Sequence, residues 1–166
     1  MKFTAQEEYG LRCLLEIARH PQGSMTIPEI AAREGLTVPN AAKLMRILRQ
    51  ANLVTSSRGQ NGGYQLARPP DQLSMGMVLN ALGGRLYSGD FCRDHTGTES
   101  VCVHDVDCSI RSLWLALDAA VERALSSMTL RDLLCTEDEM AARIDTPVTF
   151  PLRGIFPVLS CQCRTA

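Results

Sequence analysis

Three cysteines, Cys92, Cys102 and Cys108, are spaced Cys-x9-Cys-x5-Cys in a part of the chain with little periodicity. Thiolates bind zinc and iron–sulfur clusters, and thiols also oxidise reversibly. The 166-residue chain has seven cysteines, an odd number, and its N-terminal residues show no export signal. A disulfide framework is therefore not expected. These residues predict metal binding or redox sensing.

Cys108 has a further chemical advantage. Asp107 is expected to cap a long helix that runs from Cys108 to about Ser127, and the positive end of the helix dipole favours a thiolate there. Next to His104 and Asp105, this thiol could also act as an enzyme nucleophile. The sequence offers no evident oxyanion hole or substrate pocket, so we expect that the protein is not an enzyme.

A second group of residues is suited to duplex DNA. Between Gly35 and Pro70 the chain holds five basic residues and no acidic one, which suits a phosphate backbone. Asparagine can read adenine, lysine can contact guanine or phosphate, and glycines let the backbone approach the sugar–phosphate chain. The candidate DNA-contacting residues are Thr37, Pro39, Asn40, Lys43, Arg46, Arg49, Gln50, Arg58, Gly59, Asn61, Gly62, Gly63 and Tyr64.

Capping patterns predict the helices that position these residues. Thr4 and Thr26 each precede a glutamate by three residues, which is the capping box of a helix start. The second of these helices ends at Gly35, and Thr37 caps a third helix over residues 38–51. The inward residues of the third helix are Ala41, Leu44, Ile47 and Leu48. Two helices joined by a tight glycine-containing turn form a helix-turn-helix.

A β-hairpin is expected after the third helix. Residues 53–57 and 64–67 are predicted as strands, and the glycine-rich segment 58–63 is predicted as the turn between them. Such a hairpin beside a helix-turn-helix is a wing. Ser74 then caps a short helix over residues 75–82.

The long helix after Asp107 carries an apolar seam. Its members are spaced 4, 3, 4, 3 and 4 residues apart: Ile110, Trp114, Leu117, Val121, Ala124 and Met128. This heptad pattern favours packing against a second subunit, and we expect a homodimer. One more short helix is expected over residues 129–134.

The elements combine into a mostly α fold with a small β-hairpin wing, in which a winged helix-turn-helix domain is followed by a long dimerisation helix. Residues 1–84 are expected to form the DNA-binding domain, 85–107 the cysteine-containing cluster-binding loop, 108–134 the dimerisation helix with the short following helix, and 135–166 a flexible tail. No apolar run approaches the roughly 20 residues that span a bilayer, and we expect a cytoplasmic protein.

The chain shares three features with a known family. These are the wing motif RGQNGGYQL at residues 58–66, the start MKFT, and the order of elements. By these features, residues 1 to about 134 resemble the Rrf2 family of winged-helix transcriptional regulators, the group of IscR, NsrR and RirA. The resemblance implies a dimer on a palindromic operator. It also implies that Cys92, Cys102 and Cys108 hold an iron–sulfur cluster, 2Fe–2S or 4Fe–4S.

The resemblance also bears on the fourth cluster ligand. Where some members of the family have a histidine three residues after the third cysteine, this chain has Arg111, which does not bind iron. Other members use a carboxylate early in the first helix of the partner subunit, and the matching residue is Glu8. Glu8 is therefore expected ahead of His104, His95 and Asp105. The first cysteine interval, with nine intervening residues, is longer than the five common in the family.

The resulting hypothesis is a transcriptional regulator whose operator binding is controlled by a cluster that senses iron, redox or nitric oxide status. In the alternative, structural zinc on the three cysteines and a histidine, or reversible thiol oxidation, replaces the cluster. Cys13 is expected to be a small core residue, and Cys135, Cys161 and Cys163 have no predicted role.

Overall fold

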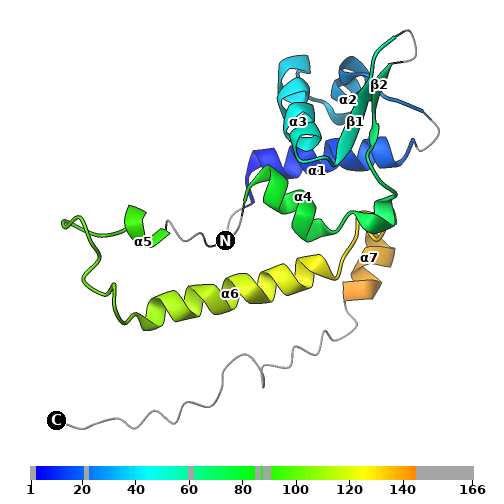
Figure 1. Ribbon diagram of the computed structural model, residues 1–166. Helices are drawn as coiled ribbons and strands as arrows, with labels where there is room; N and C mark the ends of the chain where they lie inside the picture. The colour runs from blue at the N-terminus through cyan, green and yellow to red at the C-terminus, as the bar shows by residue number, and fades with distance from the viewer. Residues whose placement is uncertain (1–2, 21–22, 60–61, 85–86, 88–90, 145–166) are drawn as a thin grey trace, which may run out of the picture. The chain divides into compact units, whose positions relative to one another are not determined.

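The computed structural model describes residues 3–20, 23–59, 62–84, 87 and 91–144. The chain forms two units, residues 1–135 and residues 136–166, and each is described by itself. The described residues of the first unit are mostly helical and include a two-stranded antiparallel sheet (Figure 1). The expected fold class, mostly α with a small hairpin wing, is confirmed.

The helix-turn-helix region has three helices: α1 (Ala5–Ala18), α2 (Ile27–Glu34) and α3 (Val38–Gln50). The side chains of Thr4, Thr26 and Thr37 each accept a hydrogen bond from the backbone N–H three residues later. The capping boxes predicted at Thr4 and Thr26 are both present. Gly35 has a φ of 65°, a left-handed conformation that ends α2 and turns the chain into α3.

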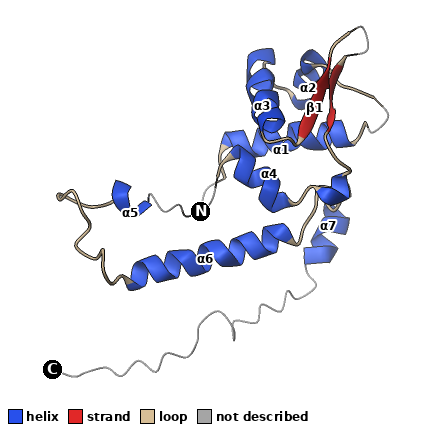
Figure 2. Cartoon of the chain, viewed as in Figure 1, coloured by secondary structure: helices blue, strands red, loops and turns tan. Residues whose placement is uncertain are grey.

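The wing consists of β1 (Val54–Ser57) and β2 (Gly63–Leu66), which pair antiparallel beside the helices (Figure 2). The segment before α2 joins this hairpin. The Met25 N–H donates to the Tyr64 carbonyl at 2.9 Å, and the Tyr64 N–H donates to the Met25 carbonyl at 2.7 Å. A Cβ at Gly63 would lie 2.8 Å from the Met25 backbone, so this close pairing requires glycine.

The core lies among α1, α2, α3, the hairpin and α4 (Met75–Leu82). Its large fully buried side chains include Leu14, Ile17, Ile30, Leu44, Met45, Leu48, Leu53, Val78 and Leu82. Burial of each such side chain contributes about 1.5–3 kcal/mol. A Cβ at Gly10 of α1 would overlap the Leu82 side chain, so this glycine allows α1 and α4 to approach closely.

The long helix α6 (Ser109–Ser126) is attached to the winged domain at its C-terminal end. The Met75 N–H donates to the Met128 carbonyl at 2.8 Å, and the Leu130 N–H donates to the Leu73 carbonyl at 2.8 Å. These bonds hold the chain after α6 against the start of α4.

Two sequence expectations in this region are wrong. Cys108, not Asp107, caps α6, because the Cys108 sulfur accepts a hydrogen bond from the Arg111 N–H at 3.4 Å. Residues 129–134 form turns rather than a short helix, because backbone bonds such as that of Leu130 direct this segment to the start of α4. The short helix α5 (Phe91–Asp94) was not predicted.

The second unit contains α7 (Glu137–Ile144), which was also not predicted. Thr136 and Glu139 form the start of this helix: the Glu139 N–H donates to the Thr136 hydroxyl at 3.3 Å, and the Glu139 carboxylate accepts from the Thr136 N–H at 2.9 Å. The remainder of the expected tail, with Cys161 and Cys163, lies outside the described residues.

Candidate DNA interface and cysteine segment

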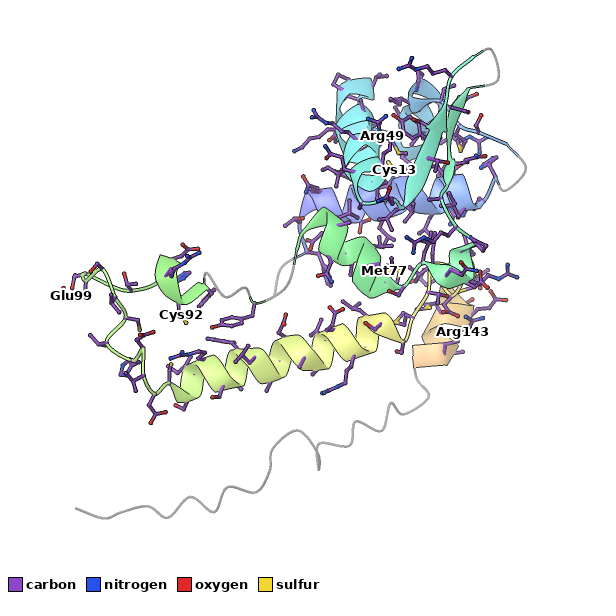
Figure 3. The ribbon with its side chains drawn as sticks, viewed as in Figure 1. Cys13, Arg49, Met77, Cys92, Glu99 and Arg143 are labelled. Atoms are coloured by element: carbon purple, nitrogen blue, oxygen red, sulfur yellow. The ribbon has the colours of Figure 1, made fainter. Side chains whose placement is uncertain are left out.

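The helix α3 has one buried face and one exposed face. The buried residues are Ala41, Leu44, Met45 and Leu48. The exposed face carries the predicted residues Pro39, Lys43, Arg46, Arg49 and Gln50, and Figure 3 labels Arg49 there. Asn40 is half-buried, and its N–H donates to the hydroxyl of the capping residue Thr37 at 3.4 Å. Burial of one face therefore presents a row of cations on the other.

The charges on that row are not neutralised within the described part of the chain. Its ion pairs join Glu34 to Arg12 at 2.8 Å, and Glu16 to Arg33 at 2.8 Å, Arg19 at 3.6 Å and His20 at 3.7 Å; none involves a cation of α3. Glu16 and Glu34 thus pair with basic residues outside α3. The exposed face of α3 can therefore bind phosphate groups.

The wing contributes a further exposed cation. Arg58 is exposed, and Gly59 has a φ of 114°, which favours glycine. A Cβ at Gly62 would lie 2.6 Å from the Ser57 carbonyl oxygen, so this residue has a structural role in the turn. The predicted contact Asn61 lies outside the described residues, and Tyr64 is half-buried.

The three cysteines of the predicted cluster site lie on different parts of one segment, residues 91–108. Cys92 is on α5 (Figure 3), Cys102 is in a turn, and Cys108 is the N-cap of α6. All three are thiols, and all three are half-buried. A hydrogen bond of 3.3 Å joins the Cys92 sulfur to the hydroxyl of Tyr87.

Arg111 stabilises the turn that precedes α6. Its guanidinium donates to the carbonyl oxygens of His104 at 3.0 Å and Asp105 at 2.5 Å. The Asp105 N–H in turn donates to the Cys102 carbonyl at 3.0 Å. Sequence reasoning excluded Arg111 as a ligand but missed this structural role, because its partners are backbone carbonyls that no residue pattern identifies.

The predicted ligands do not converge in the single chain. Among the described residues, no group of three or more His, Cys, Asp or Glu side chains is arranged to hold a metal ion. Glu8 is exposed on α1. The structure therefore brings Cys92 to Tyr87 and Cys102 to the turn at Asp105, but it does not gather the four predicted ligands.

Tyr87 is the residue of this region that sequence reasoning missed. It is 9% exposed, its N–H donates to the buried Asp118 carboxylate at 3.2 Å, and its ring lies 5.5 Å from that of Phe91. The hydrogen bond with Cys92 is the main cause that raises the pKa of the Tyr87 phenol. The sequence around Tyr87 has no periodicity that predicts its role, although its position five residues before a cysteine was a possible signal.

Cys13 contrasts with the cysteines of the segment. Its side chain is fully buried on α1, and burial, followed by the nearby charge of Glu34, raises the pKa of the thiol to about 11. The predicted core position of Cys13 agrees with this burial.

The N-terminal half of α6 exposes an apolar face. Its members are 39–57% exposed and recur at helical spacing: Ile110, Leu113, Trp114 and Leu117. Three of them belong to the predicted heptad seam, and Leu113 extends it. Among the described residues, no helix combines the length and the hydropathy needed to cross a membrane.

A helix-turn-helix with a cationic outer face, followed by a hairpin wing, defines a DNA-binding protein of the winged-helix class. The family model Rrf2, described as an iron-dependent transcriptional regulator, matches residues 3–136. The chain therefore belongs to the Rrf2 family of transcriptional regulators.

Individual relatives agree with this assignment. The chain is 36% identical to the protein rrf2 of Nitratidesulfovibrio vulgaris over 135 residues, which are 81% of this chain and 87% of that protein. The structure of IscR from T. potens is similar with a TM-score of 0.63 and 31% identity, covering 87% of this chain and 92% of that one. CymR, the global cysteine regulator of B. subtilis, has a TM-score of 0.63 and 30% identity, covering 81% and 96%.

Proposed function

We propose that this transcriptional regulator binds a palindromic operator as a homodimer and that an iron–sulfur cluster on Cys92, Cys102 and Cys108 controls its affinity. One observation carries the proposal: Cys108 caps the same helix, α6, whose N-terminal half exposes the apolar face at Ile110 to Leu117. A change at the cysteine would act directly on the helix through which two subunits pack.

The donor set fits such a cluster chemically. Three half-buried thiols in one segment are ligands that iron–sulfur clusters take, and the N-terminus of α6, which Cys108 caps, favours a negatively charged group beside it. A bound cluster would supply a group sensitive to iron, redox state or nitric oxide. Glu8 of a second subunit is the proposed fourth ligand, ahead of His104, His95 and Asp105, and either 2Fe–2S or 4Fe–4S is compatible with these residues.

The residues of the chain itself perform the DNA binding. In a dimer, two α3 helices enter successive major grooves, where Asn40 and Lys43 near the N-terminal end reach base edges. The cations Arg46 and Arg49, with Arg58 of the wing, contact phosphates and set the register. The cluster-bound and cluster-free forms must differ in affinity for the operator, because a cluster that bound the DNA-bound and free forms of the protein equally well would not change DNA binding.

A thiol-redox or zinc-containing regulator is the second candidate. Its thiol-redox form is favoured by the 30% identity with CymR, named as a global cysteine regulator. In this case Cys92, Cys102 and Cys108 would form reversible disulfides or bind zinc with a histidine.

Oxygen-free purification followed by iron, sulfide and zinc analysis tests these candidates. We expect iron and sulfide with visible charge-transfer absorption in the wild type, and their loss in Cys102→Ser. The matched control is Cys135→Ser, a half-buried thiol outside the segment, which should retain both. Protein with zinc alone, or with neither iron nor sulfide, would reject the cluster.

The same preparations test control of DNA binding. Fluorescence anisotropy, on a duplex that the protein selects from a random library, is expected to give at least about a tenfold difference in Kd between the two forms, a coupling of about 1.4 kcal/mol. Equal affinity would leave a DNA-binding protein whose cluster has no regulatory role.

A further inference from the structure

Tyr87 links the first cysteine of the segment to α6. The phenol oxygen lies 3.3 Å from the Cys92 sulfur, and the Tyr87 ring lies 5.5 Å from the ring of Phe91, so two contacts join Tyr87 to α5. Phe91 in turn stacks on His95, with ring centroids 4.1 Å apart. Tyr87 therefore determines how the short helix that carries Cys92 is held.

The other end of this link is fixed in α6. Asp118 is 5% exposed, and its carboxylate accepts the Tyr87 N–H at 3.2 Å. Cys108 is the N-cap of the same helix. Two of the three proposed ligands are thus positioned by α6, Cys108 directly and Cys92 through Tyr87.

We infer that Tyr87 is a positioning residue for the sulfur of Cys92, to which its phenol donates a hydrogen bond when Cys92 serves as a cluster ligand. This inference rests on the proposed function. A ligating cysteine is a thiolate without a proton, so only the phenol can be the donor in the contact. The Tyr87 hydroxyl therefore has a defined role in the loaded protein.

Such a bond has two measurable consequences. Hydrogen bonds to ligand sulfurs raise the reduction potential of a cluster, because they stabilise the additional negative charge of the reduced form. Groups that orient a ligand also retain the metal, and their removal costs about 10–100-fold in affinity. Both consequences belong to the hydroxyl and not to the aromatic ring.

Tyr87→Phe removes the hydroxyl and keeps the ring that contacts Phe91. The matched control is Tyr9→Phe, the same chemical change on α1, where the ring lies under the Arg12 guanidinium at 5.6 Å. Both variants and the wild type are loaded with iron and sulfide without oxygen. The midpoint potential is then measured by stepwise reduction with dithionite, and the rate of cluster loss is measured with a chelator.

We expect Tyr87→Phe to have a more negative midpoint potential and about tenfold faster cluster loss, at an unchanged unfolding temperature, while Tyr9→Phe matches the wild type. A loaded Tyr87→Phe protein with wild-type potential and retention would overturn the role of Tyr87 and leave the proposed function intact. A wild type that takes up no cluster would overturn both.

Discussion

The winged domain and the cysteine segment, residues 91–108, are held together by different forces. The winged domain is built on a core of fully buried side chains contributed by α1, α2, α3, the hairpin and α4. None of residues 91–108 is buried, and contacts from Tyr87 and Arg111 hold the segment instead. A region with few buried apolar contacts opens and rearranges at low cost. The domain is suited to present fixed DNA contacts, and the segment is suited to change with what it binds.

The largest expected difference between the two regions is in thiol reactivity. Cys13 in the domain is fully buried, whereas Cys102 in the segment is half-buried. We expect iodoacetamide to modify Cys102 at least about 1,000-fold faster than Cys13 in the native, metal-free protein, because Cys13 reacts only when the domain opens. Mass spectrometry of timed samples measures both rates. Similar rates would show that the core of the domain is not protected.

The pH dependence of Cys13 has a definite sign. Burial raises the pKa of this thiol from its ordinary value of 9.0 to about 11, so the native state keeps the proton to higher pH than the unfolded state. The contribution of Cys13 to stability is therefore constant below about pH 9 and decreases as the pH rises from 9 towards 11. The free energy of unfolding, measured with urea at a series of pH values in this range, should therefore fall more steeply with pH in the wild type than in Cys13→Ala.

Packing provides the second contrast. Leu48→Ala on α3 removes a fully buried side chain and should lower the free energy of unfolding by about 3 kcal/mol. The matched change in the segment, Val106→Ala, removes a 99% exposed side chain and should change the free energy of unfolding by less than about 0.5 kcal/mol. Urea unfolding followed by circular dichroism measures both. Equal effects would contradict the difference between the regions.

The two regions also differ in how well the sequence predicted them. The capping residues Thr4, Thr26, Thr37 and Ser74, Gly35 and the alternation of strand residues are local signals, and they correctly predicted α1 to α4 and the hairpin. In the segment, backbone-directed bonds from Arg111 and the contact from Tyr87 determine the shape, and no periodicity encodes them. Cys108 was missed as a cap because aspartate is a far commoner capping residue.

The candidate site shows the same division. The cationic face of α3 follows from helical spacing, because burying Leu44 and Leu48 turns Lys43 and Arg46 outward. The arrangement of the cysteines does not follow from spacing, since the intervals between them set only an upper limit on their separation. Assignment of a ligand set therefore depended on resemblance, whereas the exposed cationic face of α3 could be predicted from the residues themselves.

DNA affinity is the third contrast. Replacing Lys43, Arg46 and Arg58 together by glutamine should weaken operator binding about 100-fold. It should also reduce the slope of log K against log salt by roughly 2 to 3, because a phosphate that is no longer contacted keeps its counterion when the protein binds. Anisotropy across a salt series measures both quantities. Iron and sulfide content should stay at the wild-type value, since these residues lie outside the segment.

The control for this triple variant removes charge elsewhere. Arg123→Gln combined with Arg131→Gln neutralises two exposed cations outside α3 and the wing. We expect it to leave both the affinity and the salt slope nearly unchanged. If the control lost as much affinity as the triple variant, the binding would depend on net charge and not on the face of α3.

The smallest expected effect on stability comes from Cys108→Ser. Serine is a preferred N-cap, and its hydroxyl can replace the sulfur that accepts the Arg111 N–H at 3.4 Å. The free energy of unfolding of the metal-free protein should therefore be unchanged or rise by a few tenths of a kcal/mol, whereas Cys108→Ala, which removes the cap, should lose about 1 kcal/mol. Both variants should lose iron and sulfide equally. A serine variant that kept its full cluster would show that Cys108 is not a ligand. If the alanine variant lost more cluster than the serine variant, the cap of α6, and not the thiolate, would determine whether the segment binds metal.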